Sequence, residues 1–488
     1  MNPTVVALAI IAIIVAIGTL IGLSAGTRRK MDLEQWIVGD RGFGILLVWL
    51  LTAGEIYTTF TFLGASGWAY SKGAPVLYIL AYQPLMNVVA FFILPQVWEV
   101  GRKYRLQTQA DFFQVRYNNN YLSAFVALVG IVFIVPYLQL QLTGLGMIVE
   151  VASYGAIHRT PAMILAFMIV AAFVLTSGIR GVAWVSILKD LLLLFSAVFI
   201  GVAIPYIYFG GIGKMFAALV RAKPAHLVMP GATTNLGHSW YISTVLLVAV
   251  GFYMWPQFFG ASFSAKSSNT LRSNAVVMPF YSITMPLMFF VGLAATLILP
   301  GLANGDLAML TLVRKTFPAW FLGLIGGAGA LTAMVPAGIM ILTAATLFAK
   351  NMCRTILFPR MTDQQVAKLA KISVLVITSA ALCSAIYSAT TLVYLLLVGY
   401  GGVGQFFPGV VLGLYSKRVS MLGVFAGLVV GVFIFIPLMV TKHDPVIGLN
   451  AGFIALCCNF IVVAVVSLLK PAKGNGFDEL LRSNVPCI

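Results

Sequence analysis

Charged side chains are scarce in this sequence of 488 residues, of which 9% are Asp, Glu, Lys or Arg and 61% are hydrophobic. A soluble domain carries roughly 25% charged residues, so the composition excludes a soluble globular protein. Each membrane-spanning helix needs about 20 apolar residues, and on that measure we predict an all-α membrane protein with about 13 transmembrane helices. The predicted spans are 3–25, 44–71, 75–99, 122–150, 161–178, 182–209, 240–264, 275–299, 319–349, 371–388, 391–415, 420–440 and 449–469.

Cysteine and histidine are rare, with 5 and 4 residues. The cysteines have no spacing typical of a metal site or a disulfide framework, and the histidines do not cluster. The sequence therefore predicts no metal site, no cofactor and no catalysed covalent reaction, so the protein is not expected to be an enzyme. The cysteines are Cys353, Cys383, Cys457, Cys458 and Cys487.

Acidic residues number only 13 against 30 lysines and arginines, giving a net charge of +17. Most of the basic residues fall in alternate loops, beginning with the cluster 27–30 (TRRK) after the first span. By the positive-inside rule this places the N-terminus outside and the C-terminus in the cytoplasm of a bacterial-type inner membrane. The first span lacks a basic residue before it, which argues against a cleaved signal. The charge faces anionic lipid, and no nucleic acid partner is expected.

The segment 48–73 is long enough to cross a bilayer but has a polar centre. A carboxylate at mid-membrane costs several kcal/mol unless it is paired or neutral, with estimates of about 3 kcal/mol at the low end. Clustered glycines and threonines free backbone carbonyls, which membrane helices tolerate only beside a cavity. We interpret the segment as a broken helix that forms half of a binding site; the alternative is a Gly-rich packing helix with a structurally paired glutamate. The candidate residues are Gly54, Glu55, Tyr57, Thr58 and Thr59.

A second interruption is predicted five spans later, where Pro256 removes a backbone donor inside the span 240–264. Paired interruptions in two halves of a chain indicate a transporter built on inverted repeats. We predict repeats at 42–210 and 240–418, an extra helix within 1–30, two peripheral helices at 419–470 and a cytoplasmic tail at 471–488. The residues expected to face the first break are Gln139 or Gln141, Tyr253, Trp255 and Gln257. The two glutamines either line a cavity or bond across helices.

Two opposite charges, Lys189 and Asp190, lie a few turns into the span 182–209. Adjacent helical residues point about 100° apart, so we do not expect both to face one partner. Lys189 either serves the site or extends along the helix toward the inner surface.

Three stretches carry a resemblance to a known family: 61–70 (TFLGASGWAY), 178–186 (GIRGVAWVS) and 406–415 with 423–431 (FFPGVVLGLY and GVFAGLVVG). With these, the chain resembles the sodium:solute symporter family over nearly its whole length. The resemblance implies the leucine-transporter fold, a 5+5 inverted repeat with broken first and sixth core helices. It also implies uptake of a small solute held between those two helices.

The departures from the family pattern concern the sodium site. In sodium-coupled relatives, carbonyls at the first break and two hydroxyls on the eighth core helix hold the ion. The resemblance carries the carbonyls to Gly54 and Tyr57 and the hydroxyl pair to Val335 and Pro336, which have no hydroxyl. The family's aspartate on the fifth core helix falls on Ser186.

Lys189 lies three residues beyond Ser186 on the same helix face. Its ammonium is a candidate replacement for the ion, which favours H⁺ over Na⁺ as the coupling cation because a buried lysine gains and loses a proton more readily. Glu55 would then be a second proton carrier or the partner of the lysine. The alternative is a shifted sodium site with an oxygen from Thr332 or Thr343.

The sequence thus predicts a secondary active symporter that takes up a small polar solute, with an organic acid or monocarboxylate as the suggested class, by alternating access. Its partners would be the solute, a coupling cation (H⁺ or Na⁺) and the lipid bilayer. A membrane sensor that binds solute without net transport, and a channel, are the alternatives.

Overall fold

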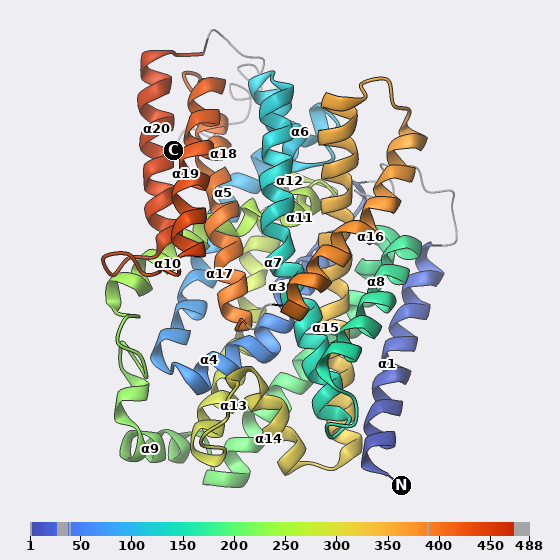
Figure 1. The fold of residues 1–488 in the computed structure, drawn as a ribbon, viewed down its shortest axis with the longest axis vertical. Coiled ribbons are helices and arrows are strands. Elements are labelled where there is room, and N and C mark those ends of the chain that lie inside the picture. Colours follow the sequence, from blue (N-terminus) through green and yellow to red (C-terminus); the bar gives the residue numbers. More distant parts are fainter. Residues whose placement is uncertain (1, 27–37, 39–40, 388–389, 473–488) are drawn as a thin grey trace.

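The structure, a computed structural model, describes residues 2–26, 38, 41–387 and 390–472, with side chains omitted at 25–26, 176–178 and 180. The described chain is helical, without a strand (Figure 1). The longer helices are α1 (Pro3–Gly26), α3 (Ile45–Ile56), α4 (Ala65–Ser71), α5 (Tyr78–Lys103), α6 (Gln109–Tyr117), α7 (Asn120–Ala152), α8 (Arg159–Phe209), α9 (Ile212–Ala222), α10 (His238–Gly251), α11 (Pro256–Ser262), α12 (Ser268–Val277), α13 (Thr284–Ile298), α14 (Ala308–Thr316), α15 (Ala319–Thr346), α16 (Asp363–Tyr387), α17 (Leu392–Val403), α18 (Phe407–Tyr415), α19 (Met421–Val440) and α20 (Ala451–Leu469).

Segments of 3-10 or π-helix join or extend these helices, and the longest of them, η8 (Leu347–Leu357), has 11 residues. They are η2 (Phe60–Gly64), η3 (Ala74–Leu77), η4 (Pro224–Leu227), η5 (Phe252–Met254), η6 (Met278–Ile283), η7 (Gly305–Leu307), η8 (Leu347–Leu357) and η9 (Gly404–Phe406). The basic cluster 27–30 and the predicted tail beyond residue 472 lie outside the described residues.

Ten helices of the described chain are long and apolar enough to cross a membrane. Two further spans are bent pairs, α3 with η2 and α4 at 54° and α10 and η5 with α11 at 52°. These are the two interruptions expected from the sequence, and both are confirmed as breaks. Arg159–Leu175 is a shorter apolar helix that corresponds to the predicted span 161–178, so the total of about 13 spans remains a prediction.

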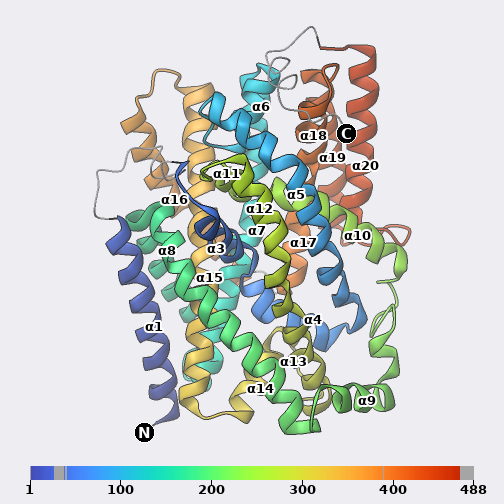
Figure 2. The ribbon, with the colours of Figure 1, turned by 180° about the vertical axis from the view of Figure 1, so that it is seen from behind.

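Helix α8 differs from the expected pair of spans joined by a tight turn, because its 51 residues keep helical backbone throughout. Its first part and its last part, Gly181–Phe209, nevertheless run in opposite directions in Figures 1 and 2. The expected reversal is present, but it is made within the helical element rather than by a loop. The last part carries Lys189 and Asp190 toward the first break.

Helix α15 is the most enclosed span, with 89% of its most apolar stretch buried, whereas the figure for α1 is 22%. Glycines allow this close packing: a Cβ at Gly323 would lie 2.8 Å from the carbonyl oxygen of Ala7 in α1. Helices α1 and α19–α20 lie at opposite sides of the molecule (Figures 1 and 2). Helix α15 therefore lies inside the bundle, and α19 and α20 lie at one side of it; the division into two repeats and two peripheral helices stays a prediction.

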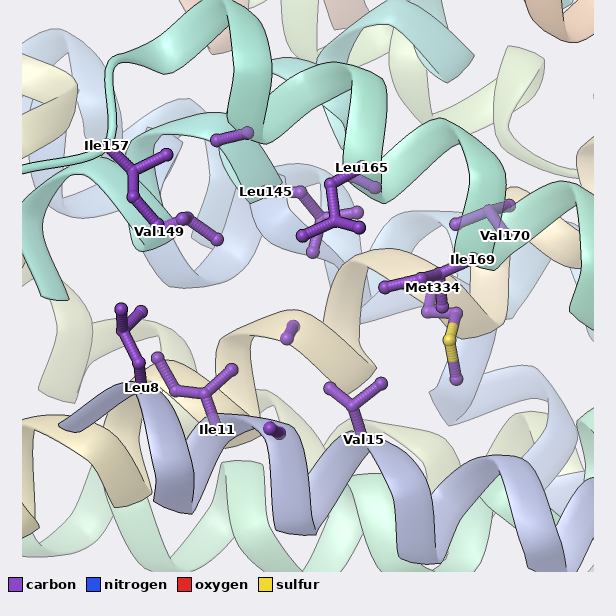
Figure 3. Close-up of a pocket in the computed structure, with 14 residues that line it drawn as sticks. Leu8, Ile11, Val15, Leu145, Val149, Ile157, Leu165, Ile169, Val170 and Met334 are labelled. Carbon is purple, nitrogen blue, oxygen red and sulfur yellow. The ribbon is translucent and has the colours of Figure 1, made fainter. Parts of the chain in front are cut away.

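An apolar cavity of about 260 Å³ lies between α1, α7, α8 and α15 (Figure 3). Only hydrophobic side chains line it, so it offers no partner for a polar solute, and the candidate site lies elsewhere. The lining residues are Leu8, Ile11, Ala12, Val15, Leu145, Val149, Ile157, Ala162, Leu165, Ala166, Ile169, Val170, Ala330 and Met334.

Candidate functional site

The first break opens where α3 ends at Ile56. Tyr57 has φ −92° and ψ 87°, outside the helical region, and helical bonding resumes in the π-turn Phe60–Gly64. Thr58 stabilises this passage because its hydroxyl oxygen accepts a bond from the Phe60 backbone N–H at 3.2 Å. The break leaves the carbonyls of Gly54 and Tyr57 available to a partner on another helix.

Lys189 on α8 is that partner. Its ammonium lies 3.0 Å from the Gly54 carbonyl oxygen, 2.9 Å from that of Tyr57 and 3.5 Å from that of Ala53. The side chain has no exposed surface, so it does not extend to the membrane surface as the alternative reading proposed. The ammonium of Lys189 therefore lies at the carbonyls of Gly54 and Tyr57, which the family resemblance implies as sodium ligands.

Asp190 completes the coordination of this ammonium, with Oδ1 at 2.8 Å from Lys189 Nζ. The two residues point about 100° apart on the helix, as the sequence indicates, yet their side chains pair with each other. Tyr281 of η6 donates its hydroxyl to the same Oδ1 at 3.4 Å, and its ring lies 4.3 Å from that of Tyr57. Asp190 and Tyr281 are site residues that the sequence reasoning missed; a carboxylate beside an intramembrane lysine was the available signal.

The other residues expected at the ion position also converge here. A Cβ at Gly54 would lie 2.6 Å from Ser186 Oγ and 3.7 Å from a methyl group of Val335 on α15. The Ser186 hydroxyl donates to the Val182 carbonyl at 3.0 Å, within its own helix. A methyl group of Val335, one of the two positions to which the family resemblance carries the hydroxyl pair, therefore faces the break.

The contacts of three neighbouring positions on α15 are as follows. Pro336 is buried in the same helix. The hydroxyl of Thr332, the residue considered for a shifted sodium site, donates to the Ala328 carbonyl at 2.7 Å. Thr343 lines a small pocket together with Gln257 of α11.

The second break follows η5, where Trp255 adopts φ −58° and ψ 128° and Pro256 starts α11. The Trp255 ring lies 4.9 Å from that of Tyr137 on α7, whose hydroxyl donates to the Glu55 carbonyl at 3.4 Å. The two breaks therefore meet through the side chains of α7. Tyr253 and Gln257, on either side of Trp255, are buried.

The structure separates the two glutamines of α7. Gln141 Oε1 accepts a bond from the Thr59 hydroxyl at 2.7 Å, so this side chain faces the first break. Gln139 Oε1 instead accepts from Ser384 on α16 at 2.7 Å, a bond across helices. Gln141 shares a face with Tyr137, four residues earlier, and belongs to the site; Gln139 does not contact it.

Several buried polar atoms around the breaks have no hydrogen-bond partner among the described residues. Native proteins pair nearly all such atoms, so a cluster of exceptions marks a place where a ligand or water binds. Glu55 is among them and makes no ion pair, so the partner of Lys189 is Asp190 and not Glu55. The atoms are both carboxyl oxygens of Glu55, Gln141 Nε2, the Tyr253 hydroxyl, Trp255 Nε1 and both amide atoms of Gln257.

Helix α6 contacts the second break. Gln109 donates its side-chain amide to the Met254 carbonyl of the second break at 2.9 Å. Two residues on, Asp111 forms an ion pair of 2.7 Å with Lys350 of η8, at the end of the span that contains α15. This helix therefore ties the second break to α15.

Comparisons with known proteins agree with this geometry. The sequence model of the sodium:solute symporter family matches residues 36–431. An uncharacterized symporter, YhjB, of Bacillus subtilis is 43% identical over 97% of this chain and 99% of its own length. A monocarboxylate transport permease protein of Rhizobium johnstonii is 28% identical over 96% of this chain and 97% of its own length.

The fold is that of a solved Na⁺-coupled sialic acid symporter, with a TM-score of 0.79 at 18% identity over 96% of this chain and 99% of the symporter. This confirms the predicted leucine-transporter-like architecture.

Proposed function

Because this chain belongs to the sodium:solute symporter family, we propose that it is a secondary active transporter that takes up a small organic acid of the monocarboxylate class together with H⁺. The observation that supports this most is the ammonium of Lys189 on the carbonyls of Gly54 and Tyr57. The solute is held between the two broken helices. Alternating access exposes this site to each side of the membrane in turn.

A carboxylate suits the unpartnered donors beside the breaks. Gln141 Nε2 and Trp255 Nε1 are buried N–H groups without hydrogen-bond partners among the described residues, and the Trp255 ring lies 4.9 Å from that of Tyr137. Neutral donors of this kind hold an anion without an opposing formal charge. Lys189 is occupied by four oxygen atoms, so these donors are the better candidates for the solute carboxylate. The monocarboxylate permease among the relatives supports the same class.

The scarcity of oxygen ligands supports proton coupling. Sodium needs several hard oxygen ligands, and a methyl group of Val335 faces the break at a position to which the family resemblance carries a hydroxyl. An ammonium already fills the position between α3 and α8. A sodium ion at that position would have to displace the ammonium of Lys189, which is part of the chain. A proton can be bound without displacing it.

The test is uptake of radiolabelled monocarboxylates into proteoliposomes under imposed gradients. A pH gradient alone, inside alkaline, is expected to drive accumulation, and a sodium gradient alone is not. Accumulation with sodium only would contradict proton coupling and favour a sodium symporter with a shifted ion site. Substrate is identified beforehand by a thermal-shift screen of carboxylates, amino acids, nucleobases and sugars, in which failure of every carboxylate would contradict the proposed class.

A further inference from the structure

Glu55 is the one charged side chain of the site for which the described structure supplies no partner. It is 1% exposed, and neither of its carboxyl oxygens makes a hydrogen bond. The opposite charges nearby satisfy each other, since Lys189 Nζ lies 2.8 Å from Asp190 Oδ1. Burying a carboxyl group without a partner is costly, so a group from outside the protein is needed at Glu55.

A small cavity adjoins this carboxyl group. It lies between the inner halves of the two broken spans, α3 and α11, and is bounded by α5 and α12. Its volume is about 20 Å³, which is room for a single group of the size of a water molecule. The polar residues that line it are Thr52, Glu55, Tyr253, Ser262 and Asn274.

Oxygen atoms dominate the polar lining of this cavity. Asn274 is 3% exposed, and its amide N–H donates to Thr52 Oγ1 at 3.4 Å, which leaves Asn274 Oδ1 buried without a partner. The Thr52 hydroxyl in turn donates to the Val48 carbonyl at 2.7 Å, and Ser262 donates to the Phe259 carbonyl at 2.6 Å. The hydroxyl hydrogens of Thr52 and Ser262 are thus used in bonds within their own helices, and the oxygen lone pairs remain available to a group in the cavity.

We propose that Glu55 and Asn274, with the hydroxyls of Thr52 and Tyr253, form a cation subsite that takes one cationic group of the size of a water molecule. The lining supplies a carboxylate and hard neutral oxygens and contains no cationic side chain, which is the composition that a monovalent cation or a primary ammonium requires. The subsite differs from the position filled by Lys189. The bound group is either a free cation or the ammonium of the solute.

The inference deepens the proposed function, but its test needs only binding to the purified protein. Thermal unfolding is titrated with NaCl, LiCl, KCl and methylammonium chloride, with choline chloride as the ionic-strength control. At least one small cation is expected to raise the unfolding midpoint saturably, as binding to the native state requires. In Glu55→Gln and Asn274→Leu the apparent Kd is expected to rise at least tenfold.

The matched control is Glu150→Gln, which removes one carboxylate from the far end of α7 and is expected to bind like the wild type. A wild type that responds to none of these cations, or a Glu55→Gln variant that responds as the wild type does, would overturn the proposal. If Glu55→Gln fails to fold, Asn274→Asp decides the matter: a second carboxylate should tighten cation binding at least tenfold, and unchanged or weaker binding counts against the subsite.

Two arms of the experiment distinguish the source of the cation. Stabilisation by Na⁺ or Li⁺ identifies a free ion, and it would also replace proton coupling in the proposed function. Stabilisation by methylammonium, together with tighter binding of alanine than of propionate, identifies the ammonium of the solute. Because no gradient is used, a failure of transport in proteoliposomes would contradict the proposed function and leave this binding result intact.

Discussion

Replacing Lys189 with alanine removes an ammonium group that four oxygen atoms hold in place, namely three backbone carbonyls and Asp190 Oδ1. The loss leaves Asp190, which is 3% exposed, with only the 3.4 Å bond from Tyr281 to that oxygen. Breaking a buried ion pair by removing one partner costs about 3–5 kcal/mol. We therefore expect Lys189→Ala to lower the free energy of unfolding by that amount and to abolish accumulation of solute.

Stability and transport are separated by a second variant. Lys189→Met combined with Asp190→Asn removes both charges, and replacing a whole buried pair is in comparable cases neutral or stabilising by about 1–4 kcal/mol. This double variant is expected to fold but still to lack accumulation, because its first break has no cation. Unfolding is followed by titration with SDS, and transport by uptake under a pH gradient. A Lys189→Ala protein that unfolds within about 1 kcal/mol of the wild type and still accumulates solute would refute the reasoning.

Three further predictions concern other parts of the molecule. Gly54→Ala places a methyl group 2.6 Å from Ser186 Oγ, so α3 must move away from α8. We expect this variant to insert into the membrane normally and to take up solute at least tenfold more slowly. Uptake equal to that of the wild type would contradict the contact. Gln141→Leu is expected to weaken carboxylate binding about tenfold, because losing one hydrogen bond of about 1.4 kcal/mol has that effect. Binding is measured by calorimetry, with Gln139→Leu as the control. Burial raises the pKa of Asp306, in the loop between α13 and α14, from its ordinary value near 4 to about 6, although a 3.0 Å bond from the Leu392 backbone N–H and the charge of Arg159 offset part of the effect. The folded protein therefore binds a proton more readily than the unfolded chain, and stability falls as the pH rises from about 4 to about 6; Asp306→Asn should remove that slope in thermal unfolding, and an unchanged slope would contradict it.

The two broken spans were predictable from the sequence because their cause is local. Pro256 cannot continue a helix, and the segment around Gly54 carries glycine and threonines where a plain span would be aliphatic. The approach of Lys189 to the first break was predictable only through the family resemblance, which implies a site residue at Ser186, three residues earlier on the same helix face. For the breaks the signal lies within one turn of the residue concerned, whereas for Lys189 it depends on that resemblance.

What could not be predicted depends on the rotation of helices and the reach of side chains. Gln139 and Gln141 are equivalent by composition, and only the packing of α7 against Thr59 and Ser384 separates them. The helical step of about 100° fixes only the directions in which the side chains of Lys189 and Asp190 start. A lysine has four methylene groups, so its ammonium folds back to the carboxylate of the next residue.

The role of Asn274 depends on contacts between distant parts of the chain. The residue is 222 positions from Thr52, its hydrogen-bond partner, and nothing in its own segment points to that contact.

The contacts of α6 have a consequence for how the second break can move. Gln109 donates to the Met254 carbonyl, while Asp111, on the same short helix, pairs with Lys350 of η8. A displacement of α6 that breaks one of these contacts also strains the other, so movements of the second break and of η8 are mechanically linked. A ligand that held α6 in place would therefore oppose both movements without contacting the breaks themselves.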